Sequence, residues 1–137
     1  MKVLFDTNVY VAEALLGEAA ESMLLATERA GWRIYVCDWI LDEIERVLVD
    51  RLEFSTRLAS LTRQRCLRRG VFVSDRPSRH GVPDDPDDSP ILRAALDAGV
   101  DYLVTNDSHL LSLNPYQSVR VISMTDYHDL LVNEGLI

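Results

Sequence analysis

Five short apolar segments rich in β-forming residues alternate with helical patterns along the chain. They are KVLF (2–5), RIYVC (33–37), GVFV (70–73), DYLVT (101–105) and VRVIS (119–123). Strands that alternate with helices form parallel sheets, because each right-handed crossover through a helix returns the chain to the same edge of the sheet. The sequence therefore predicts an α/β protein, a three-layer α/β/α sandwich whose central sheet is mainly parallel and has about five strands.

The stretches between these strands carry helix signals. They predict two helices within 7–31 with a break near Gly17, then helices over 39–50, 55–69 and 89–98, and a short helix after Thr125. No stretch separates two self-sufficient halves, and 137 residues is the usual size of one domain. We therefore expect a single domain over residues 1–137. Val11, Leu15 and Leu24 are apolar residues expected to be exposed on the first two helices.

Length and composition exclude several classes of protein. The sequence has no run of eighteen apolar residues, so no membrane span is expected. Cys37 and Cys66 fit neither a C-x-x-C motif nor a Cys/His zinc spacing. The only lysine is Lys2 and there is no G-x-x-x-x-G-K motif, which argues against receiver domains and P-loop enzymes. A reduced, cytoplasmic protein is the simplest expectation.

The charge of the chain is unevenly distributed. The net charge is −8, yet residues 51–79 hold eight arginines against two acidic residues, a local charge of +6 that leaves −14 for the rest. Nucleic-acid binding by so acidic a body requires local cations. Arg63, Arg65, Arg68 and Arg69 are therefore candidate RNA-binding residues, and a solvated helix face is the alternative.

Acidic residues stand where the predicted strands end. Asp6 closes the first strand, and Asp107 follows Thr105 and Asn106 after the fourth. Asp88 precedes the helix over 89–98, and Glu43 borders the apolar stripe of the helix over 39–50. Ligand sites of open α/β sheets lie at the carboxyl ends of the strands. We therefore expect these four carboxylates to converge at one edge of the sheet.

Each acidic residue also has an ordinary structural explanation. Asp88 and Asp107 are suitable helix N-caps, and Glu43 alone is a typical solvated helix residue. Asp84 and Asp85 are interpreted as solvated loop residues. Asp6 is harder to explain this way, because aspartate is a poor β-former at the end of an apolar strand.

Four converging carboxylates stay ionised only when a positive charge is present. A hard divalent cation such as Mg²⁺ (or Mn²⁺) takes oxygen ligands and keeps several waters. Such a cation lowers the pKa of a bound water and stabilises charge on a phosphodiester. The acidic set therefore predicts a metal-dependent phosphodiester hydrolase.

Three segments carry a family resemblance. VLFDTNV, ILDEIERVL and DPDDSPILRAALDAGVDYLVTNDSHLL resemble the signature segments of PIN-domain nucleases, in particular the toxin components (VapC-like) of bacterial type II toxin–antitoxin systems. The most specific part is D-x-x-h-h-x-x-A, here Asp88 to Ala95, followed by V-T-x-D. The likeness covers nearly the whole chain in the expected order.

The resemblance implies the role of each residue. Asp6, Glu43, Asp88 and Asp107 correspond to the family's catalytic, metal-binding acidic residues, and the polar residues Asn8 and Thr105 to positions that support them. The alanine seven residues later favours Asp88, and Asp87 is the alternative one residue away.

The resemblance also implies an endoribonuclease that acts as a toxin, with RNA as substrate, a cognate antitoxin protein and a homodimeric state. The alternative function is a non-catalytic PIN-type module that binds RNA or a protein partner. Metal-dependent cleavage of single-stranded RNA distinguishes the two.

Overall fold

The computed structural model describes residues 1–74 and 89–137. The predicted roles of Asp84, Asp85, Asp87 and Asp88 lie outside the described residues. Within the described chain every predicted strand is present, and the strands are β1 (Lys2–Phe5), β2 (Arg33–Val36), β3 (Val71–Phe72), β4 (Tyr102–Val104) and β5 (Arg120–Ile122). They form one sheet in the order β3-β2-β1-β4-β5, and every neighbouring pair is parallel. The predicted α/β class with a five-stranded parallel sheet is confirmed.

Every predicted helix is present in the described chain, and one further short helix follows β4. They are α1 (Thr7–Ala14), α2 (Glu18–Arg29), α3 (Asp38–Arg46), the π-helical turn η1 (Val47–Arg51), α4 (Thr56–Arg69), α5 (Ser89–Ala98), α6 (Ser108–Leu111) and α7 (Met124–Asn133). The single helix predicted over 39–50 is thus an α-helix that continues into a π turn. The last helix begins before Thr125, because the Ser123 side chain accepts a hydrogen bond from the Asp126 N–H and caps it.

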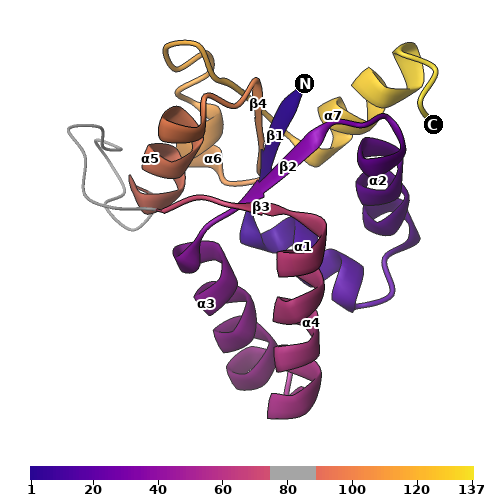
Figure 1. The fold of residues 1–137 in the computed structure, drawn as a ribbon, viewed down its shortest axis with the longest axis vertical. Helices are drawn as coiled ribbons and strands as arrows, with labels where there is room; N and C mark the ends of the chain where they lie inside the picture. Colours follow the sequence, from indigo (N-terminus) through magenta and orange to yellow (C-terminus); the bar gives the residue numbers. More distant parts are fainter. Residues whose placement is uncertain (75–88) are drawn as a thin grey trace.

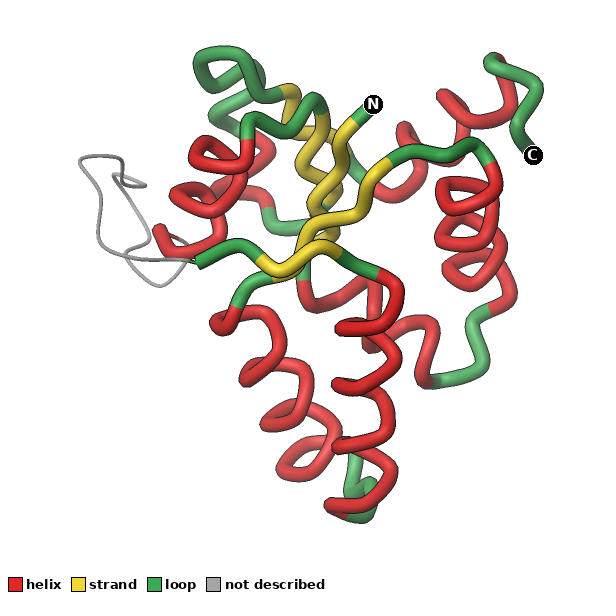
Figure 2. Tube along the Cα trace, viewed as in Figure 1, coloured by secondary structure: helices red, strands yellow, loops and turns green. Residues whose placement is uncertain are grey.

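Helices flank the sheet on both sides (Figures 1 and 2). In Figure 1, α2 and α7 lie together on one side of the sheet, and α5 and α6 lie on the other. Helices α3 and α4 pack along one another and extend away from the carboxyl edge of the sheet. β1 is the centre of the core, with Val3, Leu4 and Phe5 fully buried. Among the described residues, no helix is long and apolar enough to cross a membrane.

The break between α1 and α2 is fixed by Gly17. A Cβ at this position would lie 2.5 Å from the backbone oxygen of Ala12, so a side chain would force the turn open. After this turn α2 packs on α1, β2 and α7, and Leu24 is completely buried. The interpretation of Leu24 as an exposed residue is therefore wrong: it belongs to the core. Val11 is half-buried and Leu15 is exposed.

The order of the strands determines where a ligand site can form. The chain proceeds from β1 to β2 and β3 on one side, and then crosses to β4 and β5 on the other. The connections that leave β1 and β4 therefore diverge in opposite directions at the carboxyl edge. Open α/β sheets bind ligands in the crevice at such a switch point. Asp6 follows β1 and Thr105 follows β4, so both residues stand at this point.

Candidate active site

Asp6 is held in place by hydrogen bonds to β4, to the residue that follows β4 and to the start of α1. Its backbone N–H donates to the Val104 oxygen of β4 (2.9 Å), which continues the sheet by one residue. One carboxylate oxygen accepts the Thr7 N–H (2.7 Å) at the start of α1, and the other accepts the Thr105 hydroxyl (2.7 Å). The side chain is buried, and these contacts leave it a single orientation.

Thr105 connects Asp6 to the next acidic residue. Its buried hydroxyl donates to Asp6 and accepts the backbone N–H of Asp107 (3.0 Å). Asp107 Oδ1 in turn accepts the N–H groups of His109 (2.8 Å) and Leu110 (3.1 Å), which caps α6. Asp107 is therefore a helix cap, as its sequence context allows, and its other carboxylate oxygen remains for a ligand.

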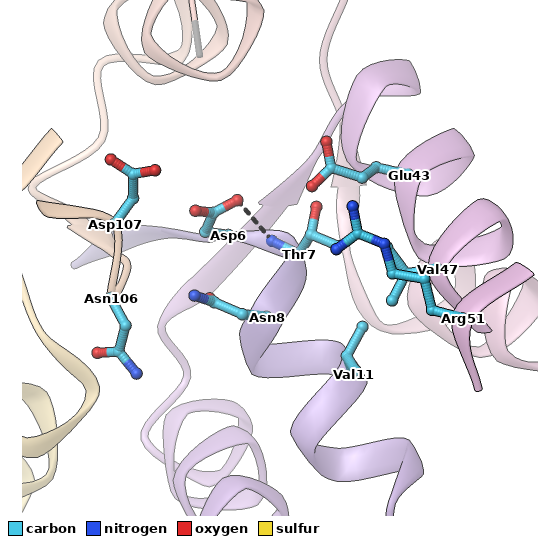
Figure 3. A pocket seen from close by; sticks show the side chains of 9 residues that line it. All are labelled: Asp6, Thr7, Asn8, Val11, Glu43, Val47, Arg51, Asn106 and Asp107. Carbon is cyan, nitrogen blue, oxygen red and sulfur yellow. Dashed lines mark hydrogen bonds between the residues drawn. The ribbon is translucent and has the colours of Figure 1, made fainter. Parts of the chain in front are cut away.

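The carboxylates of Asp6, Glu43 and Asp107 line one pocket of about 280 Å³. Figure 3 shows the three side chains pointing toward a common space from three different elements. Glu43 comes from α3, where it is partly exposed and lies 3.7 Å from the Arg46 guanidinium. Asn8 also lines the pocket, near the start of α1. The structure thus brings together three of the four predicted acidic residues and both predicted supporting residues; Asp88, like its alternative Asp87, lies outside the described residues.

The electrostatics of the pocket favour a bound cation. Burial raises the pKa of Asp6, hydrogen bonds from Thr105 and Thr7 partly oppose this effect, and the charges of Glu43 and Asp107 raise the pKa further. The Asp6 carboxylate is therefore costly to keep ionised without a positive charge nearby. Thr7 also lines the pocket, and within the described chain its buried hydroxyl has no hydrogen-bond partner.

Arg51 is a residue of the pocket that the sequence reasoning did not assign to the site. Figure 3 shows its guanidinium directed between Thr7 and Glu43. It lies eight residues after Glu43, so a regular α-helix would rotate it about 80° from Glu43. The wider π turn of η1 brings it back to the same face. The sequence carries no signal for this placement of Arg51, because the π turn on which it depends has the same apolar spacing as an α-helix.

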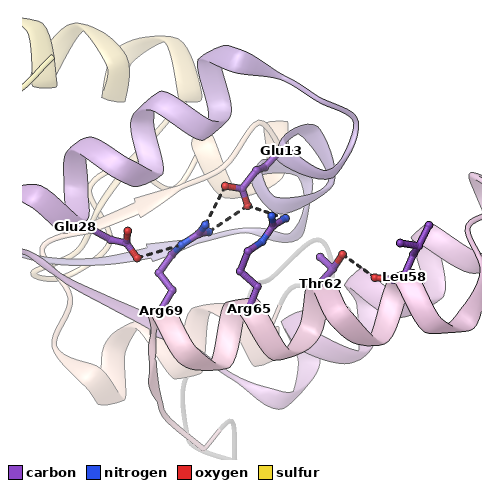
Figure 4. A network of polar contacts seen from close by, with 6 residues as sticks. All are labelled: Glu13, Glu28, Leu58, Thr62, Arg65 and Arg69. Carbon is purple, nitrogen blue, oxygen red and sulfur yellow. Dashed lines mark hydrogen bonds and ion pairs between the residues drawn. The ribbon is translucent and has the colours of Figure 1, made fainter.

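The arginines of α4 are largely engaged with carboxylates (Figure 4). Arg69 donates two hydrogen bonds to the buried Glu13 (3.1 and 3.0 Å) and pairs with Glu28 (3.2 Å). Arg65 also pairs with Glu13 (3.4 Å), and Arg63 pairs with Asp42 (2.7 Å) and Glu45. RNA binding by Arg63, Arg65, Arg68 and Arg69 stays a prediction. Arg65 and Arg68 are the two of these that are exposed.

The donor set of the pocket fits a hard divalent cation. Carboxylate, hydroxyl and amide oxygens line it, and none of its lining residues is a cysteine or histidine. In the described part of the chain, however, no three acidic, histidine or cysteine side chains are close enough to hold one ion together. Mg²⁺ takes one or two protein carboxylates directly and keeps several waters, so a cation in this pocket would be held by at most two of the three carboxylates.

The fold and the site together define an α/β protein with an acidic ligand pocket at the switch point of its sheet. A model of the PIN domain family matches residues 2–109, and the chain belongs to this family. The match covers all the candidate acidic residues from Asp6 to Asp107. PIN domains are typically metal-dependent nucleases, so membership indicates a nuclease-type function. No curated protein matches the chain.

Proposed function

We propose that this PIN-domain protein is an endoribonuclease that uses Mg²⁺ (or Mn²⁺) to hydrolyse RNA phosphodiester bonds. The observation that carries the proposal is the pocket at the switch point, where Asp6, Glu43 and Asp107 converge from three elements. A scaffold gains nothing from directing three carboxylates toward one space, because their mutual repulsion destabilises the fold. A divalent cation removes this penalty.

Each residue of the pocket has a defined part in this proposal. When bound, the cation lowers the pKa of a water and stabilises charge on the phosphodiester. Asp6 and Asp107 would hold the cation directly, and Glu43 would orient waters around it. Thr105 fixes the positions of both aspartates through its hydroxyl. Asp88, or Asp87 in the alternative register, would complete the acidic set.

Arg51 supplies the one cationic side chain among the described residues that line the pocket. A phosphate that approaches three carboxylates is repelled until their charge is compensated. A guanidinium binds phosphate oxygens in a planar, two-pronged geometry. Arg51 is therefore placed to bind the phosphate group of an RNA that enters the pocket.

The biological setting proposed here rests on the resemblance to toxin components. In that setting the protein is a cytoplasmic, homodimeric toxin that a cognate antitoxin protein neutralises. Expression should arrest bacterial growth, and Asp6→Asn should abolish the arrest. Growth arrest that persists in this variant would mean that the toxicity does not depend on the acidic pocket.

A non-catalytic PIN-type module that binds RNA or a protein partner is the second candidate. The spacing of the described carboxylates, too wide for three to hold one ion together, favours it. The deciding experiment incubates end-labelled single-stranded RNA with the protein in Mg²⁺, in Mn²⁺ and in EDTA. We expect cleavage with either metal and none in EDTA. RNA that binds and stays intact under all three conditions would favour the non-catalytic module.

A further inference from the structure

A second cavity adjoins the acidic pocket and has a different chemical character. It is an open groove of about 450 Å³ between α2 and α7, lined by Ala19, Met23, Asn106, Met124, Thr125 and His128. Asn106 lines both cavities, so they share a wall. Among the described residues, no carboxylate lines the groove, whereas three line the neighbouring pocket. The groove is therefore suited to a neutral group that is joined to whatever occupies the acidic pocket.

The side chains of the groove can form hydrogen bonds with a heteroaromatic ring and stack on it. The Asn106 side-chain oxygen accepts the Met124 N–H (3.2 Å), and this leaves the amide NH₂ group as a donor. Figure 3 shows the Asn106 side chain turned away from the three carboxylates. His128 is half-buried on α7 and offers an imidazole ring, and the two methionines offer polarisable apolar surface. Unpaired bases are recognised by stacking and by hydrogen bonds to their edges.

We infer that this groove binds one unpaired nucleobase of the RNA, next to the phosphodiester in the acidic pocket. The inference rests on the proposed function, since the acidic pocket must hold a nucleic-acid phosphate. A base and its phosphate are joined through one sugar, so two cavities with a common wall suit them. Because a paired base is not free to enter, the groove selects single-stranded RNA, and the Asn106 and His128 contacts set a base preference.

The test measures the binding of single-stranded RNA oligonucleotides in Mg²⁺ to the Glu43→Gln variant, which keeps Asp6 and Asp107 to hold the cation and is expected to leave the RNA uncleaved. Oligonucleotides in which one residue at a time is abasic are compared with the intact strand by fluorescence anisotropy. Base stacking predicts that one abasic position weakens binding about 5- to 100-fold. Added to Glu43→Gln, Ala19→Trp, which fills the groove, should abolish that difference, and His128→Ala should reduce it.

Matched controls separate the groove from general effects of substitution. Ser60→Trp places the same side chain on the exposed surface of α4, and His109→Ala removes an exposed imidazole from α6. Both variants should show the same loss of binding at the abasic position as the protein without these substitutions. An abasic effect that is unchanged in Ala19→Trp and His128→Ala, or equally lost in Ser60→Trp, would overturn the inference.

Cleavage of the same oligonucleotides by the protein with Glu43 intact distinguishes the two proposals. If the protein cleaves the RNA and the loss of binding at the abasic position is the same with and without the groove substitutions, the nuclease proposal is supported and the base-binding groove is contradicted. If the groove substitutions abolish the loss of binding at the abasic position but no RNA is cleaved, the base-binding groove is supported and the hydrolase proposal is contradicted. An absence of RNA binding by the intact protein and by the variant would contradict both.

Discussion

At the residue scale, Thr105 is the side chain through which the two aspartates of the pocket are fixed. Replacing it by valine removes the hydroxyl at nearly constant volume, so Asp6 loses a hydrogen-bond donor and the Asp107 N–H loses an acceptor. We expect Thr105→Val to lower kcat/KM for RNA about 10- to 100-fold, as loss of a group that orients metal ligands does. Thr105→Ser keeps the hydroxyl and should restore most of the activity. Equal loss in both variants would contradict the positioning role.

Asp6 makes the stability of the metal-free protein depend on pH. Its pKa is raised from 3.8 by burial, and the folded protein therefore binds this proton more tightly than the unfolded chain does. The resulting stabilisation is present below the pKa that Asp6 has in the unfolded chain. It is lost as the pH rises through the higher pKa that Asp6 has in the folded protein. In EDTA, Asp6→Asn should be more heat-stable than the parent at pH 7, by a margin that narrows on acidification. Thermal unfolding between about pH 4 and pH 8 checks this. A variant less stable than the parent at pH 7 would refute it.

Arg51 should affect substrate binding more than chemistry. It is exposed, so Arg51→Gln should change the free energy of unfolding by less than about 0.5 kcal/mol. Loss of a charge-assisted bond to phosphate should raise KM about 10-fold or more and leave kcat within a few-fold. Arg57→Gln removes an exposed arginine of α4 and serves as the control. Kinetics that are alike for both variants would exclude Arg51 from the site.

At the scale of the elements, a buried ion-pair network holds α4 against α1 and α2. Glu13 is 8% exposed and accepts both prongs of the Arg69 guanidinium. Glu13→Ala leaves the largely buried Arg69 guanidinium with only the more exposed Glu28 as a partner among the described residues, so it should destabilise the fold by about 3 kcal/mol. Arg65→Gln alters a more exposed pair and should cost less than about 1 kcal/mol. Chemical denaturation measures both, and equal effects would mean that burial does not set the strength of this network.

The elements also show which parts of the structure the sequence could predict. The break near Gly17 was predictable, because a local turn requires a residue without a Cβ. The π turn of η1 was not, because apolar spacing does not distinguish it from an α-helix. The ion pairs of Arg69 were also not predictable, because Glu13 lies 56 residues away and pattern reasoning gives no such contact. Leu24 was misplaced for the same reason: its burial depends on how α2 packs on α1, β2 and α7.

At the scale of the whole molecule, the position of the site follows from topology. Asp6 and Asp107 were predictable as neighbours because each follows a strand, and parallel strands end at one edge of the sheet. Glu43 reaches the same pocket because α3 begins at that edge directly after β2. The groove beside Asn106 was not predictable, because it depends on how α2 and α7 pack. We therefore propose that this edge of the sheet is a divalent-metal site.

Isothermal titration of the metal-free protein with Mn²⁺ tests this claim most directly. The parent should bind Mn²⁺ saturably, and free metal at about 100 times Kd should stabilise the fold by about 2.7 kcal/mol. Asp6→Asn should lose both the binding heat and the stabilisation. Asp129→Asn, which removes an exposed carboxylate from α7, should retain both. A parent protein that binds no Mn²⁺, or an Asp6→Asn variant that binds it as tightly as the parent, would contradict the account.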